Sequence, residues 1–177
     1  ESYSLFACSG ILFNHESEYR GKEFVTQKIV EKAVSISNGD ETPLVLGNID
    51  AQRDWGYAKD YTEGMYLMLQ SDRPDDYVLA TNQTTTVRDF VSKVFKEVGI
   101  SLKWSGIGIN EKGIDLKTNK VMVEISEQFY RPAEVELLIG DYSKARRELG
   151  WEPKTNLDKL VSIMVDHAKL REEVEKK

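Results

Sequence analysis

Residues 3–13 read YSLFACSGILF, an apolar run that is rich in β-forming residues and contains one glycine, Gly10. Such a run predicts a strand that is buried on both faces, as in a parallel sheet. The polar stretch 14–23 (NHESEYRGKE) indicates a loop, and apolar residues from Phe24 to Ile36 then recur at helical spacing before Asn38-Gly39. A strand, a loop and a helix in this order are typical of an α/β protein, in which loops at strand ends hold ligands.

The rest of the chain continues this alternation of strands and helices. Short apolar runs predict strands at 44–46, 77–80 and 121–125, and the polar stretch 106–120 predicts an exposed loop or hairpin. Helical spacing predicts a helix at 58–69, with an apolar face made by Tyr61, Met65, Leu67, Met68 and Leu69. No repeat or linker marks a second domain, so 177 residues are expected to form one folding unit.

Capping residues predict three further helices. Thr86 and Asp89 are expected to open a helix that runs to residue 98 and buries Val87, Phe90, Val91, Val94 and Phe95. Asp141 or Ser143 is expected to open a short helix that ends at Leu149-Gly150. Thr155 and Asp158 repeat the capping pattern before a last helix, whose apolar face is made by Leu157, Leu160, Val161, Met164, Val165 and Ala168.

The composition argues against several classes of protein. The net charge is −6, from 24 basic and 30 acidic side chains, so the chain has no overall basic surface for nucleic acid. A single cysteine, Cys8, excludes an intramolecular disulfide, and with two histidines we expect no metal site. No signal peptide and no membrane-spanning apolar run is visible, so we expect a cytoplasmic protein without a membrane partner.

Three polar clusters are candidate ligand sites, and each also has a plain structural interpretation. Residues 14–17 (NHES) with Arg20 follow the first strand, either as ligand contacts or as a solvated turn. Residues 53–56 (RDWG) offer an arginine for a phosphate, or a surface Arg–Asp ion pair beside a buried tryptophan. Residues 130–134 (YRPAE) place Arg131 and Glu134 toward one ligand, or form a turn with an exposed ion pair.

The sequence contains no recognisable motif for catalysis. It has no nucleophile elbow, no His-Glu-x-x-His, no Walker loop and no Gly-x-Gly-x-x-Gly fingerprint. The segment 106–108 (GIG) lacks the third glycine and the strand-to-helix context of that fingerprint. The residues alone therefore indicate an α/β domain with arginines suited to a phosphorylated small molecule.

The chain resembles the GDP-mannose 4,6-dehydratase family in six blocks that occur in the family's order: LFACSGILFNHES (5–17), FVTQKI (24–29), LGNIDAQRDWGYAKDY (46–61), PDDYVLAT (74–81), FYRPAEVELLIGD (129–141) and LGWEPKT (149–155). RDWG followed by KDY would indicate only the broader group of extended short-chain dehydrogenases/reductases. FNHES, LGN-x-DA-x-RDWG and YRP-x-EV are specific to the dehydratase.

The resemblance implies an α/β fold that is the C-terminal part of an extended short-chain dehydrogenase/reductase. Residues 3–13 and 77–80 would be the last strands of a Rossmann sheet, and 24–46 and 102–138 would build a small α/β substrate-binding domain. The family's glycine-rich turn and Tyr-x-x-x-Lys pair have no counterpart in residues 1–177. We therefore expect residues 1–177, starting at Glu1, to be mainly substrate-binding, to lack the N-terminal cofactor domain and the catalytic residues, and to be inactive alone.

The resemblance also implies the activity of the whole enzyme. It would convert GDP-mannose to GDP-4-keto-6-deoxymannose, a step of GDP-fucose biosynthesis, with bound NADP as hydride carrier. C4 of the sugar is oxidised, water is lost across C5 and C6, and hydride returns to C6. The enzyme is expected to be a homo-oligomer.

Nine substrate-binding residues follow from the resemblance: Asn14 near the phosphates, Val25 and Lys28 in the GDP pocket, Leu46, Gly47 and Asn48 in the guanosine-facing turn, Arg53 and Arg131 on the diphosphate, and Glu134 on the ribose hydroxyls. His15 and Arg20 match positions that touch NADP. The family's Pro-Arg-Arg after HES reads Glu18-Tyr19-Arg20 here, which exchanges a positive charge for a negative one at the cofactor contact and the tetramer interface.

Two alternatives to the dehydratase stay open at this point. One is a non-catalytic GDP-sugar-binding fragment or assembly module, and the other is a related sugar-nucleotide epimerase or reductase. Without its sheet neighbours, the first strand is expected to expose an edge and an apolar face. We therefore expect this chain to be stable only as an oligomer or in a rearranged packing.

Overall fold

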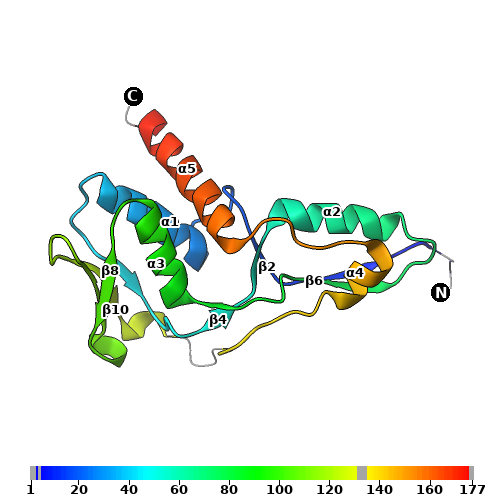
Figure 1. Ribbon diagram of the computed structural model, residues 1–177, viewed down its shortest axis with the longest axis horizontal. Coiled ribbons are helices and arrows are strands. Elements are labelled where there is room, and N and C mark those ends of the chain that lie inside the picture. The colour runs from blue at the N-terminus through cyan, green and yellow to red at the C-terminus, as the bar shows by residue number, and fades with distance from the viewer. Residues whose placement is uncertain (1–2, 4, 131–134, 176–177) are drawn as a thin grey trace. The chain divides into compact units, whose positions relative to one another are not determined.

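The computed structural model describes residue 3, residues 5–130 and residues 135–175 of the chain (Figure 1). It divides into two compact units, a division for which the sequence shows no boundary. The first unit comprises residues 1–17, 53–85 and 137–160, and the second comprises residues 18–52, 86–136 and 161–177. Because both units are assembled from separate stretches of chain, no linker in the sequence marks the boundary.

The first unit is built on two pairs of short parallel strands. Strand β1 (Ser9–Leu12) pairs with β6 (Asp76–Leu79), and β2 (Asn14–Glu16) pairs with β5 (Trp55–Tyr57). Helices α2 (Ala58–Leu69) and α4 (Ser143–Leu149) pack against β6. Their shared core contains six buried residues: Tyr61, Met68, Tyr77, Leu79, Ala145 and Trp151.

Strand β1 is parallel, as predicted, but it is neither as long nor as buried as its apolar sequence predicts. It covers four residues instead of eleven, and Ile11 is 54% exposed. The sheet that contains β1 has two strands among the described residues, so side chains of β1 lack the layers that would bury both faces. Residues 14–16, predicted as loop, form β2 because they pair with residues 55–57, a long-range contact that the local sequence does not encode.

Helix α2 has the predicted bounds but a different buried face. Tyr61 and Met68 are buried as predicted, whereas Met65 and Leu69 are 37% and 59% exposed. The buried face instead includes Gly64, where a Cβ would lie 2.7 Å from Leu79 Cδ1 and 3.0 Å from Trp151 Nε1. A glycine on this face lets the helix approach β6 closely, so hydrophobicity alone assigns the face wrongly.

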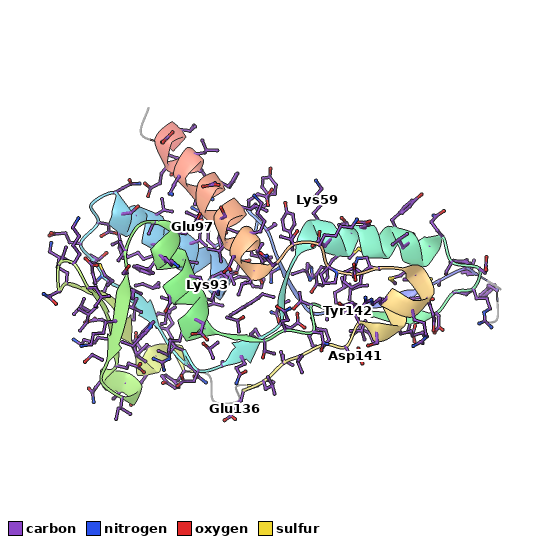
Figure 2. The ribbon with its side chains drawn as sticks, viewed as in Figure 1. Lys59, Lys93, Glu97, Glu136, Asp141 and Tyr142 are labelled. Atoms are coloured by element: carbon purple, nitrogen blue, oxygen red, sulfur yellow. The ribbon has the colours of Figure 1, made fainter. Side chains whose placement is uncertain are left out.

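Helix α4 begins after Asp141, which Figure 2 shows with Tyr142 just before the helix. Asp141 Oδ1 accepts a hydrogen bond from the Ser143 backbone N–H at 2.8 Å. The helix ends at Gly150, whose φ of +66° is the left-handed conformation that glycine adopts without strain. Both ends therefore lie where the sequence predicts them.

The second unit contains a four-stranded sheet with the order β3 (Leu44–Leu46), β10 (Val121–Ile125), β9 (Lys112–Asp115) and β8 (Leu102–Ser105). Strand β3 is parallel to β10, and the other two pairs are antiparallel. Helices α1 (Val25–Ser37) and α3 (Val87–Glu97) pack against each other, α1 also against β3 and α3 also against β8 (Figure 1). Two short 3₁₀ helices, η1 (Gly108–Asn110) and η2 (Glu127–Phe129), complete the unit.

Several predictions for this unit are confirmed. Thr86 caps α3 by accepting from the Asp89 N–H at 3.0 Å, and the five apolar residues expected in the core are all buried. Of the alternatives for 106–120, the hairpin is correct, because β9 lies there; strand β8 was not predicted. Strand β4 (Gln52–Arg53), which pairs with β7 (Thr85–Thr86), was not predicted either.

The last helix, α5 (Leu157–Glu175), is capped one residue later than the sequence predicts. Asn156 Oδ1, rather than Thr155, accepts from an N–H of the first turn, that of Lys159, at 2.9 Å. Thr155 instead donates its backbone N–H to Asp60 Oδ2 at 2.8 Å. Among the described residues, no helix is both long and apolar enough to cross a membrane.

Candidate functional site

Asp54 ties together three loops of the first unit. It lies between β4 and β5 and is completely buried. Its carboxylate accepts hydrogen bonds from the Thr81 N–H at 2.8 Å, the Thr81 hydroxyl at 2.6 Å, the Asn82 N–H at 3.0 Å and the Gly140 N–H at 3.2 Å. The alternative of a surface ion pair is therefore wrong for Asp54, because its carboxylate is buried and accepts from three backbone N–H groups and one hydroxyl. The predicted burial of Trp55 is confirmed.

Arg53, one of the two predicted phosphate ligands, lies in β4 and is partly exposed. The neighbouring Asp54 fixes the backbone at this point through its four hydrogen bonds. A side chain on such a fixed backbone loses less conformational entropy when it binds a ligand. The sequence pointed to the arginine, but not to the buried aspartate that holds its backbone.

Asn14 and His15 lie in β2, where they are opposite Trp55 and Gly56 of β5. His15 Nδ1 is 2.8 Å from the Phe13 carbonyl oxygen. Since a carbonyl can only accept, Nδ1 carries a proton, and in the neutral ring Nε2 is an acceptor. The imidazole also stacks on the Tyr61 ring, with 5.4 Å between centroids, so its orientation is fixed from two sides.

The Tyr61 hydroxyl is buried among acidic groups of the first unit. Burial, followed by the charges of Asp54, Asp60 and Glu16, raises the pKa of this phenol well above its ordinary value. Among the described residues its hydroxyl has no hydrogen-bond partner. A Cβ on Gly56 would lie 2.6 Å from that hydroxyl, so a glycine is required opposite His15.

The second unit brings together five of the predicted substrate residues. Val25 and Lys28 lie in the first turns of α1, and Leu46, Gly47 and Asn48 lie at the end of β3. Lys28 Nζ donates to the Val45 carbonyl oxygen at 2.7 Å, and burial lowers the pKa of this lysine. Asn48 Oδ1 accepts from the Asp50 N–H at 2.9 Å, which shapes the turn after Gly47.

Phe129 also belongs to this cluster, although no motif in the sequence singles it out. Lys28 Nζ lies 4.0 Å from the centroid of its ring. A Cβ on Gly47 would overlap the Phe129 carbonyl oxygen, so the two backbones touch. Phe129 belongs to the FYRPAEV block, in which only Arg131 and Glu134 were assigned a role.

Of the remaining predicted residues, Arg20 lies in the second unit with its guanidinium 3.4 Å from the centroid of the Phe24 ring. Arg131 and Glu134 lie outside the described residues. In the part of the chain that the structure describes, no three His, Cys, Asp or Glu side chains are grouped so that they could hold a metal ion.

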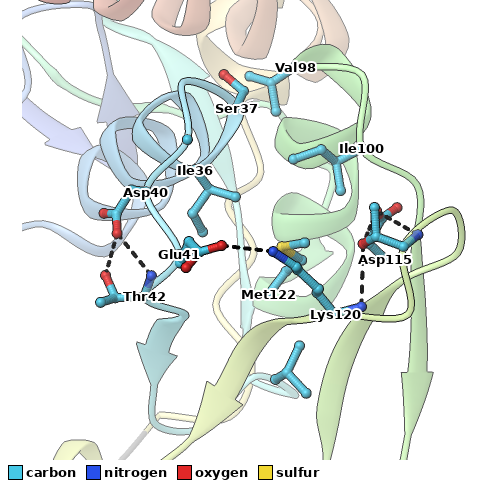
Figure 3. A pocket seen from close by; sticks show the side chains of 13 residues that line it. Ile36, Ser37, Asp40, Glu41, Thr42, Val98, Ile100, Asp115, Lys120 and Met122 are labelled. Atoms are coloured by element: carbon cyan, nitrogen blue, oxygen red, sulfur yellow. Dashed lines mark hydrogen bonds and ion pairs between the residues drawn. The ribbon is translucent and has the colours of Figure 1, made fainter.

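A separate hollow of about 580 Å³ opens in the second unit (Figure 3). Apolar side chains from the ends of α1 and α3 and from β10 line it, together with an ion pair between Glu41 and Lys120 at 2.8 Å. None of the described substrate residues lines this hollow, and its carboxylates already bind partners within the chain. It is therefore distinct from the cluster around Lys28.

Sequence comparison identifies relatives over nearly the whole chain. The family profile described as GDP-mannose 4,6 dehydratase matches residues 1–164. The chain is 52% identical over 165 residues to a GDP-mannose 4,6-dehydratase of Sinorhizobium fredii, covering 93% of this chain and 47% of that protein. It is 49% identical over 165 residues to the human GDP-mannose 4,6 dehydratase, covering 93% of this chain and 44% of the human protein. The chain thus spans about half the length of these curated relatives.

Solved structures share the fold at much lower sequence identity. RMD from Pseudomonas aeruginosa, complexed with NADPH, superposes with a TM-score of 0.78 at 15% identity, covering 96% of this chain and 50% of that one. A dTDP-glucose 4,6-dehydratase from Bacillus anthracis, in complex with NAD, gives a TM-score of 0.74 at 18% identity over 97% of this chain and 47% of that one. The α/β fold is that of extended short-chain dehydrogenases/reductases, and by its sequence the chain belongs to the GDP-mannose 4,6 dehydratase family.

Proposed function

We propose that this chain is the GDP-sugar-binding, C-terminal part of a GDP-mannose 4,6-dehydratase, a lyase that converts GDP-mannose to GDP-4-keto-6-deoxymannose with NADP. The observation that carries this proposal is the 52% identity over 165 residues to a dehydratase of that name. Since the chain spans 47% of that relative, the activity is assigned to the whole enzyme, and residues 1–177 are inactive without the cofactor domain.

Each unit contains residues that the family resemblance assigns to the substrate. In the second unit Lys28 donates to the Val45 carbonyl oxygen next to Leu46, which supports a GDP pocket lined by Val25 and Lys28 beside the guanosine-facing turn of Leu46, Gly47 and Asn48. In the first unit Arg53 and Asn14 bind the diphosphate. Arginine suits this role because its planar guanidinium can donate two parallel hydrogen bonds to phosphate oxygens. Arg131 completes the grip on the diphosphate, and Glu134 accepts from the ribose.

The residues assigned to the cofactor fit that role. The imidazole of His15 is held by the Phe13 carbonyl and the Tyr61 ring, so Nε2 can meet a polar group without a loss of ring orientation. Arg20 is held over the Phe24 ring and offers a positive charge to a phosphate. NADP, when bound, supplies the hydride acceptor and donor for the sugar.

We also propose that the whole enzyme is a cytoplasmic homo-oligomer. Exposed apolar side chains support a further protein surface against the first unit: Leu5 and Phe6 lie before β1, and Ile11 lies within it. An isolated pair of strands with such residues would associate with other strands. In the whole enzyme or its oligomer these apolar side chains are covered, which prevents such association.

The test uses the full-length protein with NADP and separate sugar nucleotides. Incubation with GDP-mannose is expected to give a product that has lost one water, detected by mass spectrometry, with no net reduction of the cofactor. UDP-glucose and UDP-galactose, offered under the same conditions, test for the epimerase alternative, and GDP-4-keto-6-deoxymannose offered with NADPH as the hydride donor tests for the reductase alternative. Turnover of one of these without turnover of GDP-mannose would overturn the proposal, and so would binding of GDP-mannose without any turnover.

A further inference from the structure

We propose that Phe129 is a positioning residue for the nucleotide base. The Phe129 ring holds Lys28, and the Phe129 backbone holds the turn at Gly47. Phe129 thereby makes the site selective for guanine. The proposal rests on the function proposed above, because it takes the turn 46–48 as the part of the site that faces the base. It adds a residue that the family resemblance does not assign, together with the way in which that residue acts.

The first step is the contact between the ring and Lys28. The ammonium of Lys28 lies 4.0 Å from the ring centroid, and it donates to the Val45 carbonyl oxygen at 2.7 Å. An aromatic face attracts a cation electrostatically, more strongly where water is excluded. Lys28 is thus fixed between β3 and Phe129, although burial works against its charged form. Without the ring, the lysine loses one of the two groups that hold it beside β3.

The second step is the backbone contact with Gly47. The segment after β10 is tied to β3 by the Ser126 N–H, which donates to the Leu46 carbonyl oxygen at 2.8 Å. The turn of η2 is closed by the Phe129 N–H, which donates to the Ser126 carbonyl oxygen at 3.2 Å. This turn places the Phe129 carbonyl against Gly47, where there is no room for a Cβ. The position of the turn 46–48 is therefore set by Phe129 from outside β3.

The third step is that burial of the ring does not explain its position. Phe129 is 49% exposed, so it adds little to the core of the unit. Its ring lies against Lys28 and its carbonyl lies against Gly47, and both of these are predicted substrate residues. Selection of one base requires hydrogen-bonding groups at fixed positions, because a misplaced group leaves a buried polar atom unpaired. A residue that fixes the turn thus acts on base selectivity more than on the chemical step.

The experiment compares Phe129→Leu, which removes the aromatic face, with Phe129→Tyr, which keeps it, in the full-length enzyme. For Phe129→Leu the affinity for GDP, measured by calorimetry, is expected to fall about tenfold. The affinity for UDP should change less than about twofold, and the KM for GDP-mannose should rise while kcat stays within about twofold. Phe129→Tyr should restore the wild-type values. Tyr66→Leu, at an exposed aromatic on α2, is the matched control and should change none of them.

A second variant addresses the backbone contact and does not depend on the folding of Phe129→Leu. Gly47→Ala adds the Cβ that would overlap the Phe129 carbonyl, so it should produce the same selective loss of GDP affinity. An equal loss of GDP and UDP affinity, or a failure of Phe129→Tyr to restore binding, would show a merely structural role and overturn the inference. Unchanged GDP binding in Phe129→Leu would overturn this inference alone. A wild-type enzyme that does not bind GDP would overturn the proposed function as well.

Discussion

The Gly140 backbone N–H donates a hydrogen bond to Asp54 Oδ2 at 3.2 Å, although 86 positions of sequence separate the two residues. The same carboxylate accepts from Thr81 and from the Asn82 N–H, so one buried side chain joins the loop after β6 to the segment before α4. Gly140 has no room for a side chain, because a Cβ there would lie 2.8 Å from Phe13 Cδ2. The close approach of the backbone makes this long-range hydrogen bond possible.

Replacing Asp54 by Asn should therefore destabilise the protein strongly. An amide keeps the shape but has one acceptor oxygen, and its NH₂ group would face either the Thr81 N–H at the Oδ1 position or the N–H groups of Asn82 and Gly140 at the Oδ2 position. Leaving buried donors unpaired should lower the free energy of unfolding by about 3 kcal/mol. The shift is measured from the midpoint of urea unfolding.

The matched control is Asp72→Asn, because Asp72 is an exposed aspartate in the turn after α2. This variant should leave the midpoint within experimental error. If Asp54→Asn were as stable as the control, the four hydrogen bonds of Asp54 would contribute nothing to the folded state.

Asp54 also illustrates what the sequence can reveal about this fold. Local patterns gave the bounds of α2, the cap of α3 and both ends of α4, because capping and helical spacing depend on neighbouring residues. Pairing between distant segments, as in β2 with β5 and β4 with β7, leaves no such local signal. For the same reason the burial of Asp54 and the shortness of β1 could not be predicted.

Arg53 and Arg131 are both assigned to the diphosphate, and their removal should weaken GDP binding. A charge-assisted hydrogen bond to phosphate is about twice as strong as a neutral one, so each change to Ala should cost about 10- to 100-fold in affinity. The affinity is measured by calorimetry with GDP and the full-length protein.

An arginine away from the site provides the comparison for these two variants. Arg73 is exposed in the turn after α2, and Arg73→Ala should bind GDP as the wild type does. Equal GDP affinity in Arg53→Ala, Arg131→Ala and Arg73→Ala would refute the assignment of the diphosphate contact.

In the candidate site, only residues whose side chains have a distinctive binding chemistry could be predicted. The resemblance supplied Lys28, Leu46 and Gly47, and the structure brings the three to one place. Phe129 was missed because an aromatic residue in a turn has no distinctive chemistry, and its contact with Gly47 is visible only once β3 and η2 are adjacent. Motifs therefore identified groups suited to bind a ligand, but not the residues that hold those groups.

Asp115 should make the stability of the protein depend on pH. The Thr118 hydroxyl, at 2.6 Å, and the N–H groups of Lys117 and Thr118 hold the pKa of this carboxyl below its ordinary value. The folded state thus binds the proton less readily than the unfolded state. The stabilisation is present in full above the unfolded pKa of about 3.9 and is lost as the pH falls through the lower folded pKa.

Asp115→Asn removes this titration and provides the test. The difference in unfolding free energy between wild type and variant should be constant from about pH 5 to 7 and should shrink below about pH 4. Urea unfolding at several pH values measures it, with Asp72→Asn as the exposed control. A difference that grew on acidification would have the wrong sign for a lowered pKa.

Tyr61 and Tyr77 are both buried; the Tyr61 hydroxyl has no hydrogen-bond partner among the described residues, whereas the Ser71 side chain interacts with the Tyr77 hydroxyl and lowers its pKa against the effect of burial. Tyr77→Phe removes that interaction and should lower the free energy of unfolding by about 1 kcal/mol. Tyr61→Phe removes a hydroxyl that is buried without a partner, so it should leave stability unchanged or raise it by up to about 1 kcal/mol. Urea unfolding of both variants measures the contrast. Equal destabilisation would mean that the Tyr61 hydroxyl has a partner in the folded protein, which would act on its pKa in addition to burial and the nearby carboxylates.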